Sequence, residues 1–245
     1  MKKAILLSSV FAVGAAFATE VTSGNAIGVL KFSTTDRPAE MLVAVPFAGY
    51  GSAACNVKVT DLISTAGLPE NTVLRVASAT PNKYDAWKLV GHEWIPLNVA
   101  EIDSKGQGKV SDIGSAADKT IGRGNSVWLD FTGLEKPTSV TLLGQEPGEG
   151  SLALVSGKWN LIGNPGVTTT FDLASSITGV GTRDQICVQD ANGKLTTYTC
   201  TYSDKSWKWK TRNDDGITIT VKSLTIKPGE GCWYFANGDN RSFTF

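Results

Sequence analysis

The sequence is poor in the residues and motifs that carry most enzyme chemistry. It contains a single histidine, His92, in the run Gly91-His92-Glu93-Trp94, whereas imidazole bases and many metal sites depend on this residue type. It also lacks the GxSxG, HExxH, P-loop and GxGxxG motifs of acyl transfer, zinc proteolysis and nucleotide binding. We therefore expect no metal, no cofactor and no enzymatic activity, and we interpret His92 as a solvated or structural residue in a turn.

The sequence has no excess of charge and, beyond its N-terminus, no long apolar run. Its 23 basic and 23 acidic residues give a formal net charge of zero. This balance argues against a nucleic-acid partner, because such partners need clustered positive charge. No later apolar run reaches the roughly 18 residues that a transmembrane helix requires, so we expect no membrane-spanning helix.

The first residues have the pattern of a cleavable secretory signal. Two lysines precede an apolar stretch that ends in Ala-Phe-Ala at position 18, which fits the small-x-small cleavage rule. We therefore predict a signal peptide over residues 1–18 and a mature chain that begins near Thr19. The protein is expected to be bacterial and to be secreted, periplasmic or bound to the cell surface.

Four cysteines lie in the predicted mature chain, namely Cys55, Cys187, Cys200 and Cys232. An even number in an exported protein usually forms disulfides. We predict a bond between Cys187 and Cys200, because the segment between them contains Asn192-Gly193, a strong hairpin signal. A two-residue loop would make these cysteines diagonal neighbours on one face, and a four-residue loop would make them directly opposed. Cys55 and Cys232 would then pair with each other or stay free.

The distribution of β-branched and aromatic residues predicts an all-β fold. Short runs of these residues recur roughly every eight to twelve positions between turn residues, as is typical of small antiparallel sheets. The chain also contains 26 glycines, which suit the turns between such strands. The best helical candidates, over residues 59–66 and 171–177, are one or two turns long at most.

A series of landmarks occurs twice in the same order. The first half contains Pro46, Tyr84, Trp94, Gly124 and Trp128, and the second half contains Pro165, Tyr198, Trp207, Gly229 and Trp233. The prolines end a strand because they cannot donate to the ladder, and the glycines supply a tight turn before a strand whose tryptophan faces the core. We therefore predict two tandem related β-sandwich or barrel-like modules of short antiparallel strands, over residues 19–138 and 139–245.

These elements resemble a family of secreted bacterial β-repeat proteins known from the Verrucomicrobia and their relatives. The resemblance rests on an Ala-x-Gly-x-x-Lys strand at residues 26–31, a Leu-Val-x-x-Pro element at residues 42–46, Trp-Asn-Leu-Ile-Gly-Asn-Pro at residues 159–165 and Pro-Gly-x-Gly-x-Trp-Tyr at residues 228–234. The first half departs from the pattern at Met41, Arg123 and Ser126. The resemblance implies export and a repeated β architecture, and it supplies no catalytic residues.

The seven tryptophans suggest a binding surface as an alternative to a purely structural role. Trp207 and Trp209 alternate with Lys208 and Lys210, so on a strand the two indoles share one face. On an exposed face they would suit stacking on sugar rings or docking a partner. Such pairs more often belong to a core, and both interpretations stay open at this point.

Three functions follow from these observations. The leading hypothesis is a non-enzymatic secreted or cell-surface β protein with a structural, adhesive or assembly role, whose partner is a surface polysaccharide or another extracellular protein. The alternative is a carbohydrate-binding module that uses Trp207 and Trp209. The third is a glycoside-type hydrolase, which needs only two suitably placed carboxylates, and the candidates are Asp61, Asp130, Asp172 and Asp214.

Overall fold

The structure is a computed structural model that describes residues 27–49, 56–78, 84–97, 115–116, 118–145, 150–167, 170–221 and 223–245. The predicted signal peptide at residues 1–18 and Cys55 lie outside these ranges. Within them the chain forms several antiparallel sheets, which confirms the all-β fold class. The helices in these described ranges are single turns inside the two predicted segments, α1 (Val59–Leu62) and α3 (Leu173–Ser176). No helix in the described part is long and apolar enough to cross a membrane.

The first large sheet has five antiparallel strands in the order β2-β8-β4-β5-β6. These strands are β2 (Glu40–Ala44), β8 (Ser126–Asp130), β4 (Val73–Ala77), β5 (Tyr84–Val90) and β6 (Glu93–Pro96). Two smaller pairs accompany the sheet, β1 (Ile27–Ser33) with β9 (Ser139–Gln145) and β3 (Asn56–Lys58) with β7 (Thr120–Gly122).

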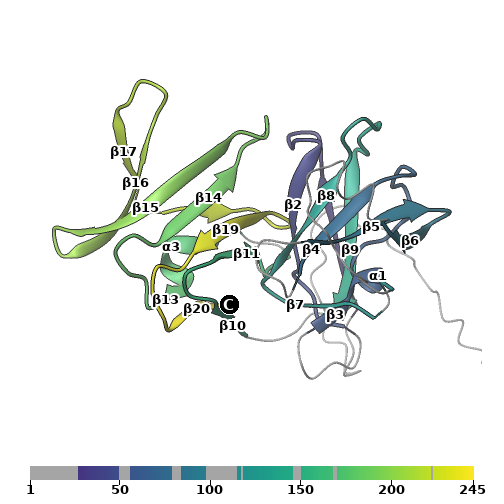
Figure 1. Ribbon diagram of the computed structural model, residues 1–245, viewed down its shortest axis with the longest axis horizontal. Coiled ribbons are helices and arrows are strands. Elements are labelled where there is room, and N and C mark those ends of the chain that lie inside the picture. Colours follow the sequence, from purple (N-terminus) through teal and green to yellow (C-terminus); the bar gives the residue numbers. More distant parts are fainter. Residues whose placement is uncertain are drawn as a thin grey trace, which may run out of the picture.

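The second large sheet has six antiparallel strands in the order β11-β19-β14-β15-β16-β17 and lies beside the first (Figure 1). These strands are β11 (Trp159–Gly163), β19 (Gly231–Phe235), β14 (Gln185–Gln189), β15 (Leu195–Ser203), β16 (Ser206–Arg212) and β17 (Thr218–Val221). The smaller sheets of this half combine β10 (Ser151–Leu154), β20 (Arg241–Thr244) and β13 (Ile177–Thr178), and pair β12 (Phe171–Asp172) with β18 (Thr225–Ile226).

The strand orders of the two halves correspond. When the sheets are aligned from the strand that precedes the landmark proline, β2, β8, β4, β5 and β6 match β11, β19, β14, β15 and β16. Each half also pairs its first strand with its last, β1 with β9 and β10 with β20, and has a short pair next to a helical turn. The second sheet differs by one additional edge strand, β17.

Each half has its own hydrophobic core. The first cluster contains Phe47 and Trp87, and the second contains Tyr234 and Phe243. Strand β9 lies beyond residue 138, yet its residues Val140 and Leu142 belong to the first cluster. The change from one core to the other therefore falls between β9 and β10, several residues after the boundary that the sequence suggested.

Reciprocal backbone hydrogen bonds join the two large sheets. The N–H of Ala44 donates to the carbonyl of Gly229 (3.2 Å), and the N–H of Gly163 donates to that of Gly124 (2.8 Å). Ala44 and Gly163 each lie two residues before the landmark proline of their half, so the two bonds are equivalent. We call these four residues the joint. The edge strands β2 and β11 thus meet in a symmetric arrangement.

The landmark prolines and glycines lie at the joint. Pro46 and Pro165 are both buried, and their carbonyls accept hydrogen bonds from the guanidinium of Arg123 at 3.1 and 2.9 Å. Gly124 and Gly229 have φ angles of +83° and +77°, which glycine adopts without the strain of a side chain. Arg123, which departs from the repeat pattern, therefore links the two halves through hydrogen bonds.

The register changes the assignment of one landmark. Trp94 stands opposite Leu89, and Trp209 stands opposite Cys200. Leu89 and Cys200 occupy equivalent positions in the two halves. The backbone N–H of each donates to the carbonyl of the residue that immediately precedes the neighbouring strand. Trp94 therefore corresponds to Trp209, whereas the order of landmarks had matched it with Trp207. The two corresponding indoles are both buried.

The structure corrects the expected Cys187–Cys200 disulfide, because both residues are free thiols. The loop between β14 and β15 consists of Ala191, Asn192 and Gly193, closed by a hydrogen bond from Asp190 N to Lys194 O. Such a three-residue loop pairs Cys187 with Thr197, which is one residue from the register of the two-residue loop and three residues from that of the four-residue loop. A shift of one residue sends a side chain to the other face, so the two cysteines lie on opposite sides of the sheet.

Candidate functional site

The two tryptophans that the sequence predicted as ligand contacts differ in exposure. Trp209 is only 1% exposed and packs in the second core against Tyr234, with ring centroids 6.3 Å apart. Trp207 is 42% exposed and contacts Tyr202 edge-on at 5.0 Å. Because Trp209 cannot reach a ligand, the two indoles do not form a shared stacking platform, even though they point to the same side of β16.

Trp128 and Trp233 meet each other beside the joint. Their rings lie 5.1 Å apart with an interplanar angle of 59°, and both side chains are half-buried. We expected each indole to face the core of its own half. The alternation along β19 gives a different result, because the neighbours Cys232 and Tyr234 occupy the second core and therefore turn Trp233 to the opposite side.

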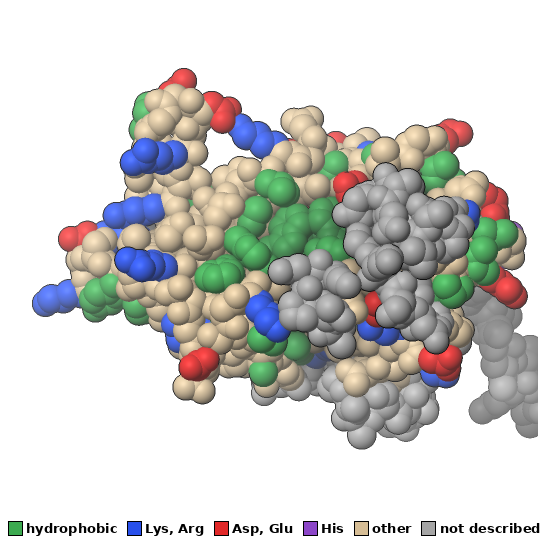
Figure 2. Space-filling model, viewed as in Figure 1, with side chains coloured by type: hydrophobic (Ala, Val, Ile, Leu, Met, Phe, Trp, Pro, Cys, Tyr) green, Lys and Arg blue, Asp and Glu red, His purple; other side chains and the backbone are tan. Residues whose placement is uncertain are grey.

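We call this opposite side of the second sheet the outer face. Trp233 stands across from Leu161, and Phe235 stands across from Trp159. Trp159 and Phe235 are in ring contact at 5.5 Å, and Trp159 remains 44% exposed. The outer face therefore carries two aromatic pairs, one at the joint and one further along β11 and β19. Figure 2 shows hydrophobic side chains gathered in the middle of the molecule, between the parts labelled β14 and β2 in Figure 1.

The far end of the outer face is basic. Lys208, Lys210 and Arg212 alternate along β16 with the core residue Trp209, so all three side chains project from the outer face. Lys208 forms an ion pair with Asp204. Lys210 and Arg212 have no acidic side chain within ion-pair distance among the described residues. A line of Lys and Arg side chains is visible along this end of the molecule (Figure 2).

Neutral polar residues connect the basic end to the aromatic pairs. In one continuous row of the ladder, Lys210 stands opposite Thr199, Thr199 opposite Gln185 and Gln185 opposite Phe235. Trp159 completes the row on the edge strand. Because neighbouring strands are about 4.8 Å apart, the row extends ~19 Å from the ammonium-bearing strand to the exposed indole.

The outer surface continues across the joint onto the first sheet. Trp128 stands opposite Leu42 on one side and Arg75 on the other. The guanidinium of Arg75 forms ion pairs with Glu40 and with the buried Asp130, the latter at 2.6 Å. This network compensates the buried charge of Arg75, and its two carboxylates outnumber the one guanidinium.

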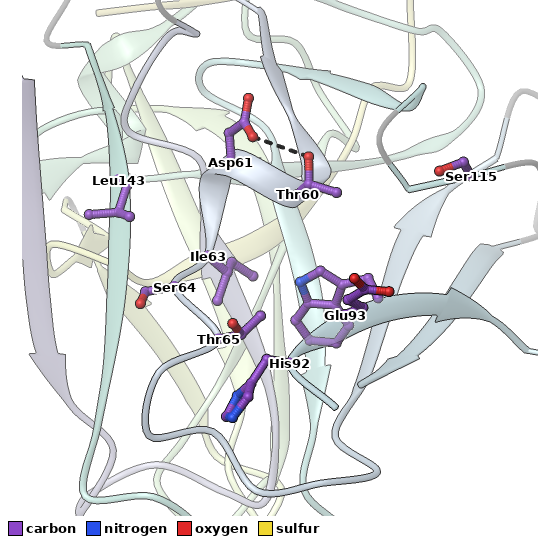
Figure 3. A pocket seen from close by; sticks show the side chains of 10 residues that line it. Thr60, Asp61, Ile63, Ser64, Thr65, His92, Glu93, Ser115 and Leu143 are labelled. Atoms are coloured by element: carbon purple, nitrogen blue, oxygen red, sulfur yellow. Dashed lines mark hydrogen bonds between the residues drawn. The ribbon is translucent and has the colours of Figure 1, made fainter. Parts of the chain in front are cut away.

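A separate cavity of about 750 Å³ lies beneath α1 in the first half. Thr60, Asp61 and Thr65 line it from the helical turn and the loop that follows, His92 lines it from the turn between β5 and β6, and Glu93 lines it from the start of β6 (Figure 3). Thr60 donates a hydrogen bond to Asp61 (3.2 Å) within this wall. His92 is exposed and has a φ of +68°, which agrees with its predicted place in a turn.

The four aspartates proposed for a hydrolase have unrelated surroundings. Asp61 is exposed at the cavity, and Asp130 is buried against Arg75. Asp172 accepts a hydrogen bond from the N–H of Leu224, and the exposed Asp214 forms an ion pair with Lys194. Each is therefore explained by a local structural contact.

The buried acid and thiols of the second core are also structural. The carboxylate of Asp184 accepts hydrogen bonds from the Tyr234 hydroxyl (2.7 Å) and from Arg241 Nε (2.9 Å). Burial, followed by this bond to Asp184, raises the pKa of Tyr234. Burial also raises the pKa of Cys200 to about 11 and raises the pKa of Cys232. Because the thiolate is the reactive form, these raised pKa values disfavour reaction of both cysteines near neutral pH.

Sequence reasoning missed Trp159 and Phe235 as surface residues. Trp159 was noted only as part of the Trp-Asn-Leu-Ile-Gly-Asn-Pro run, and nothing in that run shows which face of β11 is solvated. The available signal was alternation, since Ile162 belongs to the second core and every second residue must then point away from it.

Comparison with known proteins leaves the site to be interpreted from its own geometry. No protein-family model, curated protein or solved structure matches the chain. Among the described residues, no group of three or more histidine, cysteine, aspartate or glutamate side chains could hold a metal ion.

Proposed function

We propose that this chain is a non-enzymatic, exported β protein with an adhesive role, and that it attaches to extracellular polysaccharide through its outer face. The observation that carries the proposal is the pair of Trp159 and Phe235, which presents a 44% exposed indole on the outer face of the second sheet, where Trp233 is half-buried against Trp128. Aromatic rings exposed in this way stack on the apolar faces of sugar rings, and exposed apolar patches commonly mark interaction sites.

The corresponding architecture of the two halves supports this role. We infer that the halves are copies of one β unit, because their strand orders and the hydrogen bonds at the joint are equivalent. The secretion signal expected at residues 1–18 would bring the protein to the extracellular material that it binds. Rigid sheets also hold aromatic side chains in place at low entropic cost, which favours binding to an extended polymer.

The test compares two exposed tryptophans in the mature chain, residues 19–245. Trp159→Ala removes an indole from the outer face, whereas Trp207→Ala removes an equally exposed indole from the opposite side of the same sheet. We expect the unaltered chain and Trp207→Ala to be retained on at least one immobilised polysaccharide of a panel that includes neutral and charged polymers. Trp159→Ala should lose most of this retention.

Two results would contradict the proposal. One is no retention of the unaltered chain on any polymer of the panel. The other is equal loss of retention in Trp159→Ala and Trp207→Ala, which would mean that the outer face has no special part in binding. Circular dichroism of each variant establishes that the fold is intact before binding is compared.

A further inference from the structure

The charge distribution on the outer face indicates which class of polysaccharide it suits. The chain as a whole has no net charge, but the end of the outer face on β16 carries Lys208, Lys210 and Arg212. Asp204 compensates Lys208, whereas no ion pair is formed by Lys210 or Arg212 in the part of the chain that the structure describes. This end of the face is therefore locally positive.

The residues that stand opposite these two cations in the ladder are neutral. Lys210 lies between Thr199 on β15 and Thr220 on β17, and Arg212 lies opposite Thr218. Threonine hydroxyls bind sugar hydroxyls and do not neutralise a cation. An anion arriving at this end would therefore meet Lys210 and Arg212 with no carboxylate in their rows of the ladder; the nearby acids are Asp204, which interacts electrostatically with Lys210, and Asp214 and Asp215 in the loop after Arg212.

The aromatic and basic parts lie at opposite ends of one row. Phe235 lies three strands from Lys210, or ~14 Å, and Trp159 lies one strand further, at ~19 Å. Gln185 and Thr199 occupy the row between them, and both are partly exposed. A single short sugar could not contact both ends. An extended chain could stack on the aromatic pair, bond to Gln185 and Thr199, and place an acidic group at Lys210.

We infer that the outer face binds an anionic polysaccharide, with the chain lying across strands β11 to β16. Lys210 and Arg212 contact its carboxylate or sulfate groups, and Trp159 and Phe235 stack on its sugar rings. Charge complementarity is the argument for this ligand class, because a neutral glucan would leave the two cations without partners. The inference rests on the proposed function, since it names the kind of polysaccharide that the same face would bind.

The test uses the mature chain with three polymers, namely polygalacturonate, dextran sulfate and uncharged dextran. The variant Lys210→Gln with Arg212→Gln removes both cations. Its matched control is Lys31→Gln with Lys58→Gln, which removes two exposed lysines from strands β1 and β3 of the first half. We expect the first variant to weaken binding to the charged polymers about tenfold, as the loss of two exposed charge contacts implies, and the control to leave binding unchanged.

Ionic strength provides a second measurement. Binding of the unaltered chain to a charged polymer should weaken as salt rises, because salt screens exposed charges, and the slope should be shallower in the variant without Lys210 and Arg212. The two charged polymers separate the sources of the anion, since polygalacturonate carries carboxylates and dextran sulfate carries sulfates. Binding to either one supports the inference.

Each negative outcome has a distinct meaning. Binding of uncharged dextran as strong as that of the charged polymers, lost in Trp159→Ala, would overturn the anionic class and leave the proposed function standing. No binding to any polymer would overturn both. Binding of charged polymers that ignores Trp159→Ala, or that is matched by double-stranded DNA, would show simple attraction to charge and would also overturn the inference.

Discussion

The two tryptophans of β16 offer a direct test of how the second half is packed. Trp207 and Trp209 are two residues apart on the same side of one strand, yet the first is 42% exposed and the second 1% exposed. Replacing each by alanine removes the same atoms from the same strand. The difference between the two variants therefore measures the surroundings of the indoles and not their chemistry.

The expected magnitudes differ severalfold. Trp209 packs against Tyr234 and stands opposite the buried Cys200, so Trp209→Ala should lower the free energy of unfolding by about 3–5 kcal/mol, as for other large core truncations. Trp207→Ala loses one edge-on ring contact with Tyr202, which is worth about 1 kcal/mol. For a chain of this size, the melting temperature falls by roughly 2–4 °C per kcal/mol.

Urea denaturation followed by far-ultraviolet circular dichroism measures both variants without using tryptophan as the probe. Linear extrapolation then gives the free energy of unfolding of each. A loss for Trp207→Ala as large as that for Trp209→Ala would refute the register in which Cys200 faces Trp209, because that register alone buries one indole and exposes the other.

Four further predictions concern the second half and the joint. Peptide mass spectrometry after alkylation in urea without reductant should recover Cys187 and Cys200 as separately labelled thiols, and a peptide crosslinked between them would contradict the observed register. Because burial raises the pKa of Cys200 to about 11, its labelling in the native protein should stay slow at pH 8. Gly231→Val places a carbon 2.5 Å from Ser126 Cβ and should cost about 1–3 kcal/mol in urea denaturation; an unchanged midpoint would contradict this close approach. Asp184→Ala leaves a guanidinium unpaired and should cost about 3–5 kcal/mol, partly recovered when Arg241→Ala is added; no recovery in that double variant would contradict the coupling.

The sequence predicted the class of fold and the places where strands end. Alternation and turn residues were sufficient for this, because each is a local property of a few neighbouring positions. Pro46 and Pro165 end strands, and Gly124 and Gly229 have positive φ, as their residue types required. The two helical turns also fall where a short helix was expected.

The sequence could not predict the register, and two expectations depended on it. An Asn-Gly pair favours a hairpin of two loop residues, but the loop before Lys194 has three, closed by Asp190. The additional loop residue places Cys187 and Cys200 on opposite faces of the sheet. The same kind of shift made Trp209, instead of Trp207, the partner of Trp94. Which loop forms depends on the packing of both strands against the core, which no short window of sequence contains.

The position of the candidate site follows from how the two halves are joined. A sheet edge exposes unpaired backbone groups, and each edge strand at the joint donates to the other half: Ala44 of β2 bonds to Gly229, before β19, and Gly163 of β11 bonds to Gly124, before β8. This contact is close because Gly163 has no side chain; a Cβ there would lie 2.7 Å from Ala44 Cα. The same close approach brings Trp128 and Trp233 into contact on the outer side. Either half alone would expose an isolated edge and only one indole of the Trp128–Trp233 pair, whereas the joined halves present a wider aromatic surface on which an extended polymer could lie.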